Sequence, residues 1–67
     1  MHHWIAKRQT LGKRADGTGS VKIPKGTRVS GDTDSPLPET IRFWIDPITG
    51  DEFWLETERF FRDFQRA

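Results

Sequence analysis

Hydrophobic positions gather most densely between residues 41 and 56, where the chain reads IRFWIDPITGDEFWLE. Two runs rich in β-branched and aromatic residues flank the segment Pro47-Ile48-Thr49-Gly50, and such residues fit a pleated, half-buried surface. Proline presets φ for a turn, glycine accepts positive φ, and Asp46 can accept hydrogen bonds from nearby backbone amides. The pattern predicts a β-hairpin with a four-residue loop at the centre of the fold.

Two registers fit this hairpin, and they differ in which aromatic side chains face outward. One register pairs Phe43 with Trp54 and Trp44 with Phe53, whereas a shift by one residue pairs Trp44 with Trp54. Such a slip exchanges the two faces of a strand. Either register leaves at least one tryptophan outside the main apolar face, where tryptophan is a common anchor of binding surfaces. In the second register the apolar face contains Ile41, Phe43, Ile45, Phe53 and Leu55.

Weaker patterns predict the strands before the hairpin. Residues 4–11 begin with an apolar cluster and continue with charged residues, which suits an edge strand or an extended arm. Residues 20–23 and 27–30 alternate apolar and polar positions around the turn Pro24-Lys25-Gly26. They predict two short strands, or one strand broken by a bulge. Their core candidates are Val21, Ile23 and Val29.

Residues 57–66 predict a helix at the C-terminal end of the sequence. Thr57 is a suitable N-cap, and the three phenylalanines that follow are spaced to form one apolar stripe against the sheet. The arginines of the last turn suit the negative end of the helix dipole. The stripe contains Phe60, Phe61 and Phe64, and the solvent side is expected to carry Arg59, Arg62, Asp63 and Arg66.

Together these elements predict a mostly-β (β+α) fold. Five short strands and one helix favour an SH3-like, partly open antiparallel barrel or bent sheet, with a three-stranded sheet packed on the helix as the alternative. Residues 1–67 are expected to form a single domain. Within it, residues 1–3 are predicted to be a frayed N-terminus, 12–20 a flexible basic loop, and 31–39 a proline-containing loop that Leu37 holds on the core.

Composition narrows the class of protein. The 67 residues include no cysteine, so three tryptophans and five phenylalanines must build the core without disulfides or a thiolate zinc site. No apolar run reaches the ~18 residues that span a bilayer, and the N-terminus lacks the ~7–15 apolar residues of a signal peptide. We expect a soluble, cytoplasmic protein without a membrane partner.

No catalytic, metal or cofactor site is expected. The only histidines, His2 and His3, are adjacent and lack a third ligand, which makes a poor zinc site. Asp32 and Asp34 resemble the opening of a calcium loop, but prolines stand where that loop needs glycine and further ligands. No serine has a plausible base beside it in the sequence. These observations argue against an enzyme.

Charge is unevenly distributed along the chain. Residues 1–28 hold seven basic side chains and one acidic one, whereas residues 29–67 hold four arginines and nine acidic residues. The net charge of +1 therefore hides two halves of opposite sign. Such halves can pair with each other inside the fold, or they can meet partners of opposite charge.

Within residues 43–54, an aromatic pair, an aspartate, a turn with threonine near its end, and a tryptophan follow in order. These residues are Phe43, Trp44, Asp46, Thr49 and Trp54. The order resembles the second hairpin of WW domains. The first strand of those domains and its tryptophan have no counterpart here. The resemblance therefore implies shared hairpin chemistry rather than membership of the family, and proline-peptide binding is not carried over.

The first functional hypothesis is a non-catalytic module that binds a protein partner. Exposed aromatic residues of the hairpin would anchor the partner, and the acidic C-terminal half would meet a basic surface. Compact, cysteine-free, charge-segregated chains resemble in style small phage- or mobile-element-encoded proteins that bind a host factor in the host cytoplasm. The candidate contact residues are Trp44, Trp54, Phe43, Arg42 and Glu52.

Two alternatives stay open. A nucleic-acid-binding module would use the basic N-terminal half on phosphates, with Trp4 or Trp44 stacking on a base. A structural component of a larger assembly would order its basic arm on a neighbour. The sequence does not set the oligomeric state. The candidate nucleic-acid contacts are Lys7, Arg8, Lys13, Arg14, Lys22, Lys25, Arg28 and Trp4.

Overall fold

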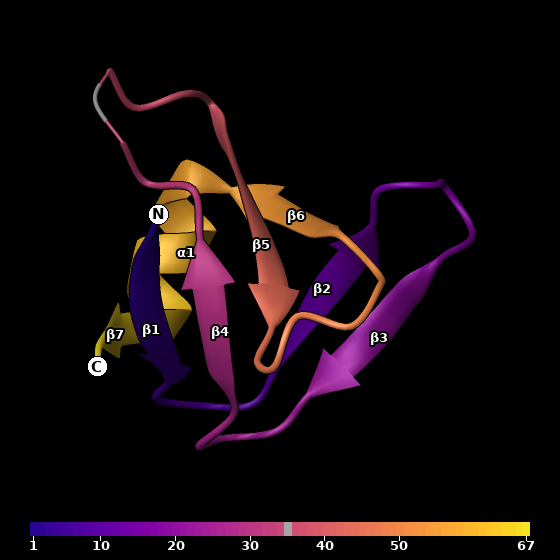
Figure 1. Ribbon diagram of the computed structural model, residues 1–67, viewed down its shortest axis with the longest axis horizontal. Helices are drawn as coiled ribbons and strands as arrows, with labels where there is room; N and C mark the ends of the chain where they lie inside the picture. Colours follow the sequence, from indigo (N-terminus) through magenta and orange to yellow (C-terminus); the bar gives the residue numbers. More distant parts are fainter. Residues whose placement is uncertain (35) are drawn as a thin grey trace.

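Seven antiparallel strands form one sheet that curls into a partly open barrel in the computed structural model, which describes residues 1–34 and 36–67 (Figure 1). The spatial order of the strands is β3-β2-β6-β5-β4-β1-β7. One short helix packs against the barrel. Because strands make up most of the regular structure, the predicted mostly-β fold class is confirmed. The elements are β1 (His2–Ala6), β2 (Thr10–Arg14), β3 (Ser20–Ile23), β4 (Arg28–Gly31), β5 (Thr40–Ile45), β6 (Phe53–Glu56), α1 (Thr57–Asp63) and β7 (Phe64–Arg66).

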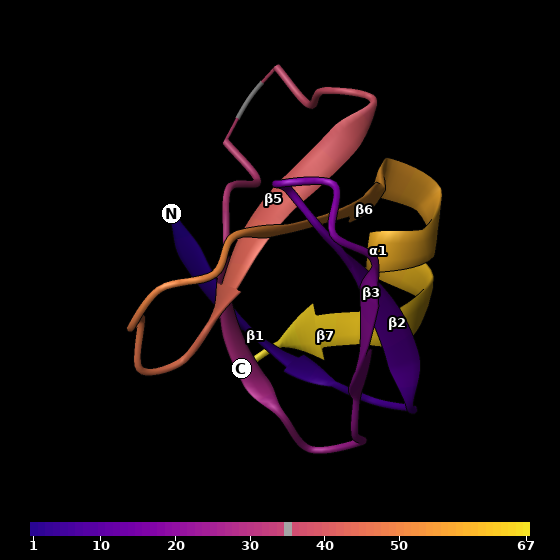
Figure 2. The same cartoon turned by 90° about the vertical axis from the view of Figure 1, so that its right-hand side faces the viewer.

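Aromatic rings fill the space between the curled sheet and α1. The rings of Phe60 and Phe64 stack with centroids 4.6 Å apart, and Phe43 lies 5.4–5.7 Å from Phe53, Phe60 and Phe64. Figure 2 shows α1 on one side of the barrel, with β7 running back across the sheet from its end. The buried apolar core comprises Trp4, Ala6, Ile23, Val29, Ile41, Phe43, Phe53, Leu55, Phe60 and Phe64.

The central hairpin exists, but its register is neither of the two expected. Phe43 pairs with Phe53 and Arg42 with Trp54, and residues 46–52 replace the predicted four-residue loop. This register differs by two residues from the one that pairs Trp44 with Trp54, so it gives the same two faces. Phe43 and Phe53 face the core, and both tryptophans face outward.

Residues 2–6 form an internal strand of the sheet, so the prediction of a frayed segment 1–3 was wrong for His2 and His3. His2 and His3 belong to β1, which pairs with β4 on one side and with β7 on the other. Residues 4–11, predicted as one edge strand or extended arm, are divided between β1 and β2 by the turn at residues 7–9, and β1 is internal rather than at an edge of the sheet. The reason is β7, which the sequence pattern had assigned to the last turn of the helix.

Two predicted loops are shorter than expected. Residues 12–14 continue β2 and residue 20 begins β3, so only residues 15–19 connect these strands. Gly31 ends β4, which leaves residues 32–39 for the second loop, and Ser35 lies outside the described residues. Leu37 does not hold this loop on the core, because 53% of its surface is exposed. The Thr57 hydroxyl does so instead, by donating to the Pro38 carbonyl at 2.5 Å rather than capping α1.

The helix ends at Asp63, and this carboxylate is buried rather than on the solvent side as predicted. It accepts hydrogen bonds from the Thr10 hydroxyl at 2.7 Å and from Arg62 Nε at 2.9 Å, and Arg8 Nε lies 3.6 Å away. Burial acts to raise the pKa of Asp63, but the hydrogen bonds and the two guanidinium charges outweigh it and lower the pKa below its ordinary value of 3.8. The carboxylate thus ties α1 to β2.

Residues 1–34 and 36–67 form no helix with the length and apolar character needed to cross a bilayer.

Gly12 lies where the core has no room for a side chain, and we predict that Gly12→Ala destabilises the protein. An added Cβ would lie 2.8 Å from Ile23 Cδ1 and 3.2–3.3 Å from the rings of Phe43 and Phe53, all of which are buried. Overpacking of this kind costs about 1–3 kcal/mol in the free energy of unfolding, measurable by urea titration. Gly50→Ala is the matched control, because its Cβ meets open space; it should change stability by less than about 1 kcal/mol. Equal effects of the two substitutions would contradict the packing argument.

We predict that Asp63 makes stability fall in acid. Because its pKa is lower in the folded than in the unfolded chain, its stabilising contribution is complete above the ordinary pKa of 3.8 and is lost as the pH falls through the folded pKa. The free energy of unfolding of Asp63→Asn should therefore lie below that of the wild type near neutral pH, with a gap that narrows between about pH 5 and pH 2. Asp51→Asn, which removes an exposed partner of Arg14, is the control and should follow the wild type closely. Parallel curves for Asp63→Asn and wild type would refute this role.

Candidate functional site

Trp54 lies on the outer face of the barrel with charged side chains on all sides. Lys13 of β2 and Arg42 of β5 are its cross-strand neighbours, and the Lys13 ammonium lies 4.6 Å from the centre of the indole. Glu52 and Glu56 precede and follow it by two positions, which places them on the same side of an extended chain. We call these five residues the Trp54 surface. It has the make-up of a binding anchor with a polar rim.

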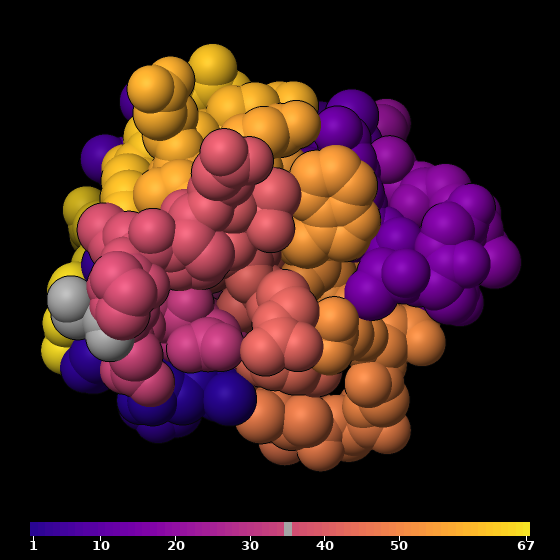
Figure 3. All heavy atoms as spheres, turned by 90° about the horizontal axis from the view of Figure 1, so that it is seen from above, coloured from indigo at the N-terminus to yellow at the C-terminus, as the bar shows by residue number. Residues whose placement is uncertain are grey.

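Two shallow hollows border Trp54, one on each side. Figure 3 shows the β5 and β6 segments side by side, with the residues around the β2–β3 loop next to β6. The larger hollow, about 390 Å³, is lined by Ala15, Thr40, Arg42, Glu52 and Trp54. The smaller hollow, about 260 Å³, is lined by Lys13, Arg14, Ala15, Gly17, Gly19, Ser20 and Trp54. The indole thus forms the ridge between two concave regions that could receive side chains of a partner.

Cations and carboxylates alternate across this surface and pair with one another. Lys13 Nζ donates to Glu56 at 3.1 Å. The guanidinium of Arg42 lies 3.3 Å from the carboxylate of Asp32, which is the first residue after β4. A hydrogen bond from its own backbone amide and the bond from Lys13 lower the pKa of Glu56 below its ordinary value of 4.5. The surface therefore carries both signs of charge rather than one.

The structure separates the hairpin residues that were predicted to act together. Trp44 lies on the outer face opposite Ser30 and is partly exposed, as Trp54 is. Arg42 is exposed on the same face. Phe43 points to the other face and has none of its surface exposed, so its assignment to a binding surface was wrong. Alternation along β5 explains the difference, since neighbouring residues face opposite ways.

The predicted nucleic-acid contacts do not form one surface. Lys13 and Arg14 lie near Trp54 and are paired with Glu56 and Asp51. Trp4 is buried at 8% exposure, edge-on to Phe60, so it cannot stack on a base as predicted. Lys22 projects from β3. The remaining members, which lie in or beside the β1–β2 and β3–β4 turns, are Lys7, Arg8, Lys25 and Arg28.

A serine, a histidine and an aspartate meet on the outer face near β1. The Ser30 hydroxyl donates to Asp46 at 2.6 Å, and both residues approach the same nitrogen of His3, Nδ1, at 3.3 Å. In a catalytic relay the imidazole stands between hydroxyl and carboxylate and uses a different nitrogen for each. This cluster lacks that arrangement. It joins β1, β4 and the 46–52 loop instead.

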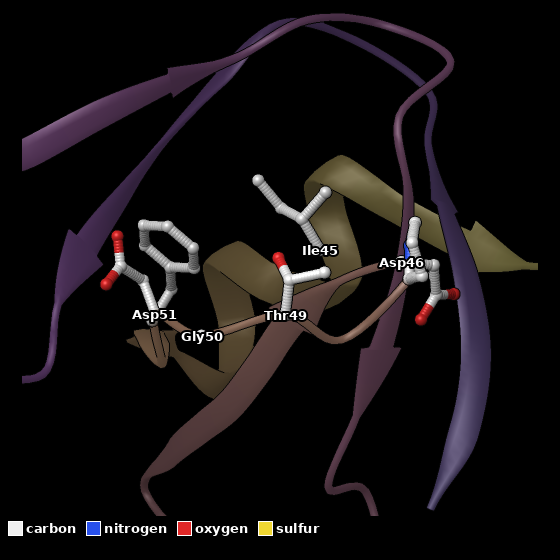
Figure 4. Close-up of a pocket in the computed structure, with 7 residues that line it drawn as sticks. Ile45, Asp46, Thr49, Gly50 and Asp51 are labelled. Carbon is white, nitrogen blue, oxygen red and sulfur yellow. The ribbon is translucent and has the colours of Figure 1, made fainter.

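The 46–52 loop encloses a hollow of about 280 Å³ with Ile45 and Phe53 among its lining residues. Figure 4 shows Ile45 and Thr49 projecting to the same side of the loop, with the carboxylates of Asp46 and Asp51 at its two ends. Asp46 accepts a hydrogen bond from the Ser30 hydroxyl, and Asp51 forms an ion pair with Arg14. Both carboxylates are therefore engaged in holding the loop. The described part of the chain brings no three metal-ligating side chains together.

The sequence pattern missed Leu11, which is 46% exposed and lies on the same side of β2 as Lys13. Its signal was the spacing Leu11-x-Lys13, two positions apart on one strand. That signal was lost because the predicted strand ended at Leu11 and the predicted loop began at Gly12. With β2 extended to Arg14, Leu11 becomes a further apolar side chain on the face that carries Trp54.

Comparison with models of known protein families, with curated proteins and with solved structures found no match.

Proposed function

We propose that this chain is a non-catalytic protein-binding module that engages its partner through the Trp54 surface. The observation that carries the proposal is the placement of Trp54, which is partly exposed between two hollows while the phenylalanines of the same hairpin are fully used in the core. Tryptophan buries a large apolar area at small entropic cost and is enriched among residues that dominate binding energy.

The mixed charge of the surface favours a protein over a nucleic acid at this site. Lys13, Arg14 and Arg42 are each paired with a carboxylate, so the face offers a phosphate backbone no excess of positive charge. A protein partner can satisfy both signs and gains specificity from matching them. Trp54 then supplies the apolar contact at the centre of the rim.

The size of the chain sets the extent of such an interface. A standard protein interface buries about 800 Å² on each partner. The chain exposes 4280 Å² in total, so an interface of that size would cover roughly a fifth of it. It would therefore reach beyond Trp54 itself, and the apolar outer-face residues diagonal to it on the neighbouring strands are Leu11 on β2 and Trp44 on β5.

The test compares Trp54→Ala with Leu37→Ala, which removes a more exposed apolar side chain from the 32–39 loop. Each full chain is immobilised, proteins captured from a lysate of the source cells are identified by mass spectrometry, and the affinity of the captured protein is then measured. Loss of a central tryptophan should cost about 2 kcal/mol, or about 30-fold in affinity, while Leu37→Ala binds as the wild type does.

Folding is checked separately, because Trp54 also covers part of the sheet. Trp54→Phe keeps an aromatic ring and should retain part of the affinity, and urea unfolding shows that each variant is folded. A partner that binds Trp54→Ala as tightly as the wild type would overturn the proposal.

A further inference from the structure

A second charged surface lies at the end of the barrel where two turns meet. The β1–β2 turn and the β3–β4 turn are joined by backbone hydrogen bonds, from Ala6 N–H to the Thr27 carbonyl at 2.9 Å and from Gly26 N–H to the Ala6 carbonyl at 2.7 Å. Figures 1 and 2 both show the two turns at the same end of the molecule. Four exposed cations, which we call the basic end, lie in these turns or begin β4: Lys7, Arg8, Lys25 and Arg28.

Carboxylates near the basic end are already engaged. Asp63 is buried and bonded to Thr10 and Arg62, with Arg8 as a more distant third partner at 3.6 Å. Asp46, whose backbone N–H donates to the Arg28 carbonyl, accepts from Ser30 and contacts His3. Within residues 1–34 and 36–67, neither Lys7, Lys25 nor Arg28 forms an ion pair. The basic end therefore keeps an uncompensated positive charge.

The chemistry of the basic end fits phosphates better than a protein surface. Protein interfaces are built on apolar anchors, and none of the large exposed apolar side chains lies in the two turns. Those side chains are Met1, Leu11, Leu37 and Ile48. Phosphate contacts need only accessible cations, because their affinity comes from release of counterions.

The same end offers nothing to stack on a base. Trp4 is the nearest tryptophan in sequence, but it is buried against Phe60, and the guanidinium of Arg66 covers its ring at 5.4 Å from the centroid. Proteins that hold single strands use exposed aromatic platforms, which these turns lack. A duplex presents the denser row of phosphates and requires no stacking.

We propose that the basic end binds the phosphate backbone of double-stranded nucleic acid without reading its bases. This site is separate from the Trp54 surface and does not depend on the function proposed for it. With three to four phosphate contacts, the logarithm of the affinity should fall with the logarithm of salt concentration at a slope of about −2.7 to −3.6. Between about 50 and 200 mM salt, this slope corresponds to a loss of roughly 40- to 150-fold.

The experiment measures fluorescence anisotropy of a short labelled DNA duplex of mixed sequence with the full chain over a salt series. The triple variant Lys7→Gln, Lys25→Gln and Arg28→Gln should bind about 100-fold more weakly at about 50 mM salt, and its salt slope should fall to about −1. A scrambled duplex sequence should bind with unchanged affinity, because phosphates carry no sequence information.

The matched control is the triple variant Lys22→Gln, Arg59→Gln and Arg66→Gln, which has the same net charge but keeps the basic end. It should retain nearly the wild-type affinity and slope. Equal losses of affinity in the two triple variants would show that net charge alone attracts the duplex, and would overturn the proposed site. Circular dichroism and urea unfolding establish that both variants are folded.

Three further outcomes would overturn the proposal. No binding of the duplex at about 50 mM salt would overturn the proposal, because phosphate contacts are strongest at low salt. Tighter binding of the matching single strand would show that bases are stacked. Tighter binding of a polyglutamate peptide of equal charge would identify an acidic protein segment as the occupant. The Trp54→Ala variant should bind the duplex as the wild type does, which separates this test from that of the protein-binding surface.

Discussion

The packing of Phe43 against three other phenylalanine rings is the contact on which the rest of the structure depends. Its partners come from β6, α1 and β7, so one side chain joins the central hairpin to both elements that follow it. A chain of 67 residues without cysteine has no covalent crosslink to replace this contact. Gly12 completes the arrangement, because only a residue without a side chain lets β2 lie against these rings.

This core also determines which side chains remain for binding. Because neighbouring residues of a strand face opposite ways, placing Phe43 and Phe53 inside turns Arg42, Trp44 and Trp54 outward. The Trp54 surface is thus a consequence of how the aromatic core is packed. The cost of leaving a tryptophan partly exposed is offset in part by Lys13, whose ammonium lies over the indole.

Ion pairing divides the cations of the chain into two groups with different uses. Those beside Trp54 lie next to carboxylates of the C-terminal half, so the opposite charges of the two halves are largely matched there. Of those in the two turns at the end of the barrel, only Arg8 lies within ion-pair distance of a carboxylate in the part of the chain that the structure describes, and that carboxylate, Asp63, is buried. Folding therefore turns a charge asymmetry along the sequence into a mixed surface at one place and a positive surface at another.

The sequence by itself determined the fold class, the central hairpin and most of the core, because these follow from local alternation and from aromatic residues that must be buried. It could not determine the hairpin register, the strand pairing of His2 and His3, or the burial of Asp63. Each of these depends on contacts between residues far apart in the chain, above all on β7, whose phenylalanine fits a helical stripe equally well. Only the tertiary structure decided that Trp54 faces outward, because a shift of one residue in the hairpin would have exchanged its place with the core.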